Sequence, residues 1–104
     1  MKFYQKAGEN AMANKVLEIC DAIELTREVT MEIVRPLAIT IDPDGSSVHV
    51  KSIRDLEQIP GTLKFEERDG DVYTHNASKT ICGVRFFCLL TRDEYEAVRL
   101  QEAS

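Results

Sequence analysis

The spacing of hydrophobic residues changes near Thr30, and this change limits what the chain can fold into. Before that point Met12, Val16, Ile19, Cys20 and Ile23 recur at intervals of three and four residues. This rhythm is typical of an amphipathic helix and predicts one over residues 14–25. On a helical wheel Arg27 falls within the apolar stripe and Leu25 falls opposite it, so we expect the helix to end between Leu25 and Glu28.

From Thr30 onward the spacing becomes two, which predicts a half-buried strand from Thr30 to Ile41. Pro36 cannot donate to a strand ladder, so this strand is expected at a sheet edge or with a bulge near Pro36. Residues 42–45, Asp-Pro-Asp-Gly, predict a tight turn. A return strand over residues 46–51, with Val48 and Val50 inward and His49 outward, completes a hairpin.

The second half of the sequence alternates turn signals with short apolar runs. Ser52 with Asp55 predicts a short helix, and Pro60-Gly61 ends it. Residues 63–75 predict a second hairpin around Asp69-Gly70, with residues 76–78 as an interruption. Cys82-Gly83 predicts another turn before residues 84–90, the most apolar run and therefore a central strand. Thr91 with Glu94 forms a capping box that starts a helix over residues 92–102.

Together these signals predict an α+β fold in one domain. We expect an antiparallel sheet of about five strands, in two or three hairpins, with an N-terminal helix, a short middle helix and a C-terminal helix. The domain is expected to cover residues 14–104, because residues 1–13 are poorly patterned and read as a leader, either native or added. The length of 104 residues and the 43% hydrophobic content suit a core that needs no metal or disulfide.

Composition narrows the classes of function. Three cysteines without framework spacing favour a reducing, cytoplasmic setting, and no apolar run reaches the length of a membrane span. The net charge of −5 and the lack of a basic patch argue against direct nucleic-acid binding. The histidines and cysteines lack zinc-site spacing, and no phosphate-binding or calcium-loop motif occurs, so no metal or cofactor is expected.

An acidic ridge on the first helix is the feature that rises above background. Glu18, Asp21, Glu24 and Glu28 fall on one flank of the wheel, while Lys15 and Arg27 are expected to project in other directions. A surface of one sign attracts a basic partner. The alternative interpretation is a solvated helix face.

Three hypotheses follow. The first is a small acidic protein-binding or regulatory module, such as an inhibitor of a basic, nucleic-acid-binding protein; accessory proteins of mobile genetic elements often fit this description. The second is a small-ligand-binding domain with a pocket between helices and sheet or at a dimer seam, using Tyr73, His75, Arg85 and Tyr95. The third is an enzyme with His75 as base and Ser78 or Cys82 as nucleophile, which we rank last because no catalytic motif supports it. Homodimerisation through the edge strand is left open.

Overall fold

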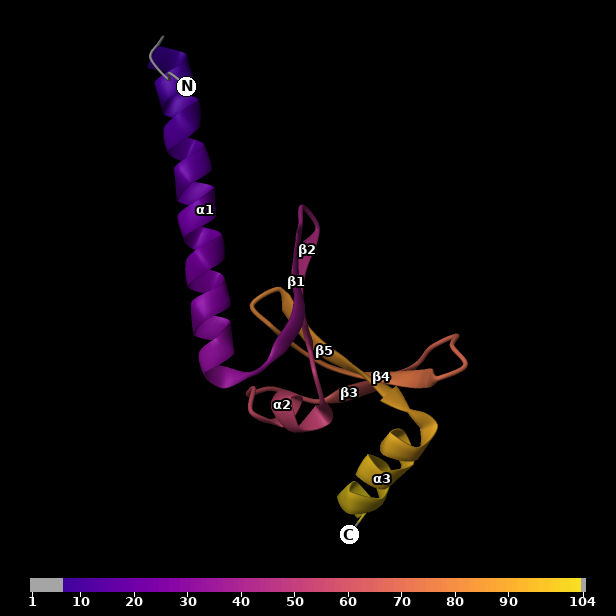
Figure 1. Ribbon diagram of the computed structural model, residues 1–104. Helices are drawn as coiled ribbons and strands as arrows, with labels where there is room; N and C mark the ends of the chain where they lie inside the picture. The colour runs from indigo at the N-terminus through magenta and orange to yellow at the C-terminus, as the bar shows by residue number, and fades with distance from the viewer. Residues whose placement is uncertain (1–6, 104) are drawn as a thin grey trace. The chain divides into compact units, whose positions relative to one another are not determined.

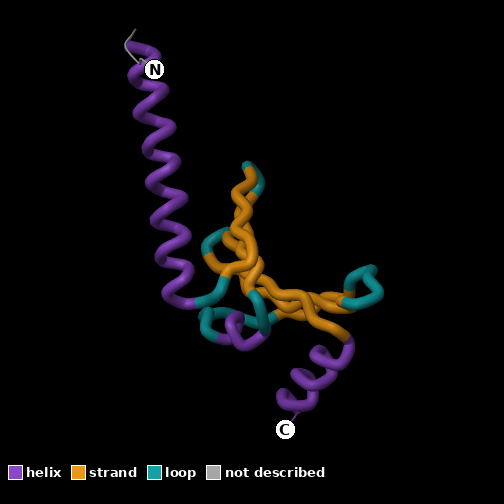
Figure 2. Tube along the Cα trace, viewed as in Figure 1, coloured by secondary structure: helices purple, strands orange, loops and turns teal. Residues whose placement is uncertain are grey.

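The computed structural model describes residues 7–103, and it describes side-chain surroundings for residues 11–101. The elements in chain order are α1 (Ala7–Ile33), β1 (Pro36–Asp42), β2 (Gly45–Val50), α2 (Ile53–Glu57), β3 (Lys64–Glu67), β4 (Tyr73–Ile81), β5 (Val84–Thr91) and α3 (Arg92–Ala103) (Figures 1 and 2). Contacts within the chain divide it into two units, with the boundary after Glu32. We call the second, residues 33–104, the sheet unit.

Helix α1 is much longer than the sequence predicts. The expected end between Leu25 and Glu28 is wrong, and so is the strand from Thr30, because the helix continues to Ile33. Arg27 does not end the helix, since its guanidinium remains exposed and pairs with Glu24 one turn earlier. Pro36 sets the end instead, because the ring of a proline disfavours helical backbone in the residue before it.

Residues 7–13 of the predicted leader form the first turns of α1, and residues 1–6 lie outside the described part of the chain. That residues 14–104 form one domain stays a prediction. The fold is α+β as predicted, with three helices and a five-stranded sheet in the described residues.

The sheet has the order β1-β2-β5-β4-β3. Three of its strand pairs are antiparallel, but β2 and β5 run parallel, so the predicted purely antiparallel sheet is wrong. Parallel neighbours need a long crossover, and the segment from Lys51 to Gly83, with α2, β3 and β4, supplies one. The apolar β5 is central, as predicted, and Pro36 begins the edge strand β1 beside a register shift.

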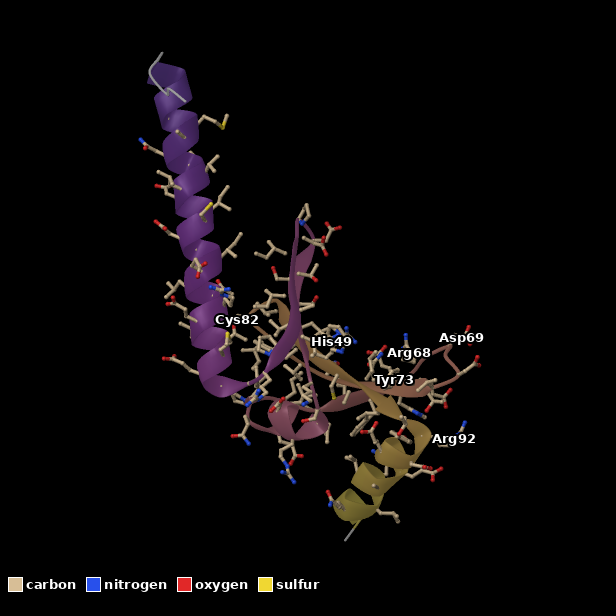
Figure 3. All side chains as sticks on the ribbon, in the orientation of Figure 1. His49, Arg68, Asp69, Tyr73, Cys82 and Arg92 are labelled. Carbon is tan, nitrogen blue, oxygen red and sulfur yellow. The ribbon has the colours of Figure 1, made fainter. Side chains whose placement is uncertain are left out.

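The turns predicted at residues 42–45 and 82–83 are both present. The β1–β2 hairpin closes at Asp42 and Gly45. Cys82 and Gly83 join β4 to β5, and both have positive φ, 51° and 81°. This backbone is that of a two-residue hairpin turn whose twist matches the flanking strands. Figure 3 shows Cys82 at this turn and Arg68 and Asp69 at the other end of the sheet, between β3 and β4.

Strand β4 is not interrupted, which corrects the prediction for residues 76–78. Asn76, Ala77 and Ser78 pair with Leu89, Cys88 and Phe87 of β5. Ala77 and Ser78 are buried. The polar residues that suggest a turn in the sequence are therefore held in the ladder by neighbours on both sides, β3 and β5.

Both short helices of the sheet unit contact the same face of the sheet, which we call the helix face. Leu56 and Ile59 pack there with Val48, Val50, Ala77, Cys88 and Leu90. The ammonium group of the buried Lys79 also reaches this face, where it donates to the carbonyl oxygen of Ile59 over 2.6 Å. The predicted caps are confirmed: the Ser52 hydroxyl accepts from the Asp55 amide, and Thr91 and Glu94 form the reciprocal capping box.

Candidate functional site

The acidic ridge lies on α1, and all four of its carboxylates are exposed. Two of them are paired: Glu18 lies 3.6 Å from the Lys15 ammonium, and Glu24 lies 2.6 Å from the Arg27 guanidinium. The expectation that Lys15 and Arg27 project elsewhere is therefore wrong, because their long side chains reach a residue three positions away. Asp21 and Glu28 make no ion pair within the part of the chain that the structure describes, so about half of the ridge keeps an uncompensated charge.

The side of α1 opposite the ridge carries an apolar stripe, and further apolar side chains, such as Leu17 and Leu25, lie outside that stripe. The helix exposes nine large apolar side chains: Met12, Val16, Leu17, Ile19, Ile23, Leu25, Val29, Met31 and Ile33. Their exposed fractions run from 46% to 66%. An exposed apolar stripe of this kind is typical of a protein interaction site rather than of a solvated face.

The four predicted ligand-binding residues do not converge. His75 and Tyr95 lie on the helix face, where their rings stack with centroids 3.7 Å apart and planes 2° apart. His75 is 8% exposed, and its Nδ1 lies 2.9 Å from the Thr74 hydroxyl. Arg85 lies on the opposite face of the sheet, which we call the second face, and its guanidinium is 3.3 Å from the amide oxygen of Asn76. Neighbouring strand residues point to opposite faces, so Asn76 and its partner Arg85 lie across the sheet from His75 and Tyr95. These residues therefore cannot line one site.

The second face carries a group of stacked polar and aromatic side chains. The His49 imidazole stacks on the Phe87 ring, with centroids 4.6 Å apart and planes 10° apart. The Arg85 guanidinium lies over the same ring at 4.7 Å. Partial burial lowers the pKa of His49 below its ordinary value, so this imidazole is neutral at pH 7.

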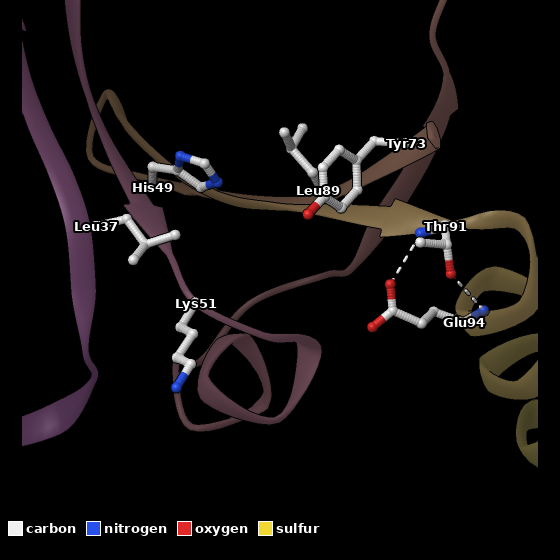
Figure 4. Close-up of a pocket in the computed structure, with 7 residues that line it drawn as sticks. All are labelled: Leu37, His49, Lys51, Tyr73, Leu89, Thr91 and Glu94. Carbon is white, nitrogen blue, oxygen red and sulfur yellow. Dashed lines mark hydrogen bonds between the residues drawn. The ribbon is translucent and has the colours of Figure 1, made fainter. Parts of the chain in front are cut away.

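A pocket of about 340 Å³ opens beside this group. Its lining residues are Leu37, His49, Lys51, Tyr73, Leu89, Thr91 and Glu94 (Figure 4). Of the predicted ligand-binding residues, only Tyr73 belongs to it. The Glu94 carboxylate is engaged by the backbone amide of Thr91, which leaves Lys51 as the charged group of the pocket that is free of a polar partner in the described chain. The pocket therefore combines one cationic group with apolar, aromatic and hydroxyl-bearing side chains.

Sequence reasoning missed His49, Lys51, Leu37 and Leu89 as pocket residues. His49 was expected to be a solvated face residue, yet it is half-buried against Phe87. The alternation of the strands places each of these side chains on the correct face, but only the parallel pairing of β2 with β5 brings them together. No local signal in the sequence predicts that pairing.

The residues considered for catalysis are separated. His75 and Ser78 stand three apart on β4 and so face opposite sides of the sheet. Cys82 is exposed in the β4–β5 turn. Burial, with the Glu94 and Asp55 carboxylates adding to it, raises the pKa of the Cys88 thiol to about 11, so this thiol stays protonated at pH 7.

Within the described residues, no three histidine, cysteine, aspartate or glutamate side chains gather closely enough to hold a metal ion. Among the same residues, no helix combines the length and the apolar content that crossing a membrane requires. Comparison of the chain with family models, with curated proteins and with solved structures finds no match.

Proposed function

We propose that this chain is a protein-binding module and that α1 is its binding element. The observation that supports the proposal most strongly is the stripe of exposed apolar side chains, Met12, Val16, Ile19, Ile23 and Ile33, along one 27-residue helix. An isolated helix of this length gains little from hydrogen bonding alone in water, and most helical stability in proteins comes from packing of the apolar face. A partner that covers this face would stabilise the helix and would itself be bound by it.

The acidic side of α1 gives the partner a preferred charge. When the apolar side is covered, Asp21 and Glu28 remain available to cations of a bound protein. Attraction between opposite charges accelerates encounter and weakens as salt rises. The finer proposal, which the sequence suggested, is a basic target whose nucleic-acid-binding surface the chain occupies and inhibits.

Paired substitutions on the two sides of α1 test this proposal. Ile19→Gln with Ile23→Gln places two uncharged polar side chains in the apolar stripe, whereas Leu17→Gln with Leu25→Gln makes the same kind of change outside the stripe and leaves the charge of the acidic side unaltered. The tagged full-length chain and both variants would be compared for the proteins they retain from the chain's own cells. We expect the first variant to lose the retained partner and the second to keep it. Equal retention by both would contradict the proposal.

The basic character of the partner needs a separate measurement. Asp21→Asn with Glu28→Gln removes the two unpaired charges without changing side-chain size appreciably. We expect this variant to bind the partner more weakly at low salt and with a flatter salt dependence than the wild type. An unchanged salt dependence would contradict a basic partner while leaving binding through the apolar side intact.

A second candidate function is small-ligand binding in the pocket of the second face, and the convergence of Tyr73, Leu89 and Lys51 favours it. Binding to the native state alone raises the melting temperature by mass action. A thermal-shift screen with aromatic carboxylates, metabolites and nucleotides would measure this, with Lys51→Ala as the variant that loses the response. Lys64→Ala, which removes an exposed lysine outside the pocket lining, is the matched control. A flat screen would contradict this candidate.

A further inference from the structure

The apolar side of α1 follows a heptad repeat. From Met12 the intervals alternate strictly between four and three residues, through Met12, Val16, Ile19, Ile23, Thr26, Thr30 and Ile33. These are the a and d positions of a coiled coil, with Val16, Ile23 and Thr30 at a and the other four residues at d. We call these seven residues the seam.

The two polar members of the seam are already satisfied within the helix. The Thr26 hydroxyl donates to the Ala22 carbonyl oxygen over 2.7 Å, and the Thr30 hydroxyl donates to the Thr26 carbonyl oxygen over 2.6 Å. Burying these residues against a partner therefore leaves no hydroxyl without an acceptor. Their methyl groups remain to pack in the seam.

The charges of α1 are arranged so that two copies can approach. The positions that flank the seam, e and g, hold Ala13, Cys20, Arg27, Lys15, Ala22 and Val29, with no carboxylate among them. The carboxylates from residue 12 to residue 33 all occupy the b, c and f positions of the outer side. Asp21 and Glu28 are at f, and across two packed helices such groups stand roughly 20 Å apart, beyond the Debye length of about 8 Å.

The seam is long enough for a stable pair. Residues 12–33 extend about 33 Å along the helix at 1.5 Å per residue. A strip of that length that covers half the circumference of a helix about 10 Å across has an area of about 500 Å². Two copies would then bury about 1,000 Å² in total, which meets the lower limit of about 1,000 Å² for a biological interface.

We infer that α1 pairs with α1 of a second copy of this chain, as a two-stranded coiled coil through the seam. This inference rests on the proposed function, because it names the protein that covers the apolar side. β-Branched residues fill every a position, as in two-stranded coiled coils, whereas Ile19 and Ile33 at d are of the type found in higher assemblies, so the measured mass must decide the number of strands. The acidic ridge then faces outward on both copies, and a dimer presents it twice to a basic partner.

The test measures the mass of the full-length chain in solution, by light scattering across a range of concentrations and with a reducing agent present to exclude disulfides through Cys20 or Cys82. We expect twice the chain mass of 11.8 kDa. Ile19→Lys with Ile23→Lys should raise the dimer dissociation constant about 100-fold or more, because it buries charge without a partner. Leu17→Lys with Leu25→Lys, whose parent side chains are 60% and 61% exposed but lie outside the seam, should leave the constant unchanged.

A third variant removes the possibility that the lysine variants merely fail to fold. Thr30→Val keeps the shape of a seam residue and removes its hydroxyl, so the dimer should tighten by about tenfold. A wild-type chain that stays monomeric at 100 micromolar, or a dimer that both lysine variants weaken equally, would overturn the coiled coil. If the wild type is monomeric but substitution of Ile19 and Ile23 still abolishes retention of the cellular partner, the proposed function stands without the dimer. If these substitutions change neither the mass in solution nor the retention, both the dimer and the proposed function are refuted.

Discussion

The buried thiol of Cys88 makes the stability of the sheet unit depend on alkaline pH. Cys88 has no exposed surface, and burial raises its pKa from an ordinary 9.0 to about 11. The unfolded thiol loses its proton from about pH 9, whereas the native thiol keeps it until about pH 11. Unfolding is therefore favoured as pH rises through this window, and the contribution present below pH 9 is lost.

The size of the effect follows from the shift of about two pKa units. Each unit corresponds to about 1.4 kcal/mol, so the free energy of unfolding should fall by about 3 kcal/mol in total and by about 2 kcal/mol at pH 10.5. Urea unfolding at pH 8 and pH 10.5, followed by circular dichroism at one protein concentration, measures the change. The midpoint should fall by roughly 1 to 2 M because of this thiol alone.

Cys88→Ala is the matched control, because alanine lowers stability at every pH but cannot ionise. Any other group that ionises in this window contributes equally to both proteins. The difference between the wild type and the variant therefore isolates the thiol. If stability falls between pH 8 and pH 10.5 by the same amount in both proteins, the reasoning from burial to ionisation is refuted.

Three further predictions concern the sheet unit, and urea or thermal unfolding checks each. Leu56→Ala should lower the free energy of unfolding by 2 to 5 kcal/mol, since Leu56 is fully buried; a loss below about 1 kcal/mol would contradict its place in the core. Thr91→Ala should cost about 1 kcal/mol by removing the Glu94 capping box, and an unchanged midpoint would argue against the cap. Cys82→Asn should stabilise by about 0.5 kcal/mol, because asparagine tolerates the positive φ beside Gly83 better; destabilisation would speak against that turn.

The sequence predicts the local parts of this fold well. The turn at residues 42–45, the Ser52 cap, the Cys82-Gly83 turn and the capping box of Thr91 all depend on neighbours within four residues, and each appears in the structure. The central place of β5 was also predicted, because a strand that is apolar on both faces must be covered.

The failures have two physical causes. The end of α1 was misplaced because a lone arginine in an apolar stripe signals a break only if that stripe is buried, and Arg27 is exposed and paired with Glu24. The parallel pairing of β2 with β5 was missed because it joins segments that share no local signal. The candidate sites show the same contrast. The acidic ridge could be predicted from local helical spacing, whereas the pocket around His49 depends on the pairing of strands distant in sequence.

The parallel pair also has a consequence for how the chain folds. Ser46 pairs with Val84, about 38 residues later, whereas the two hairpins at Gly45 and Gly83 close over only a few residues. Closing a short loop costs less chain entropy than closing a long one, so each hairpin can form early and by itself. Joining β2 to β5 is then the late, slow event in folding, and a chain arrested before it would display two unpaired strand edges to its neighbours.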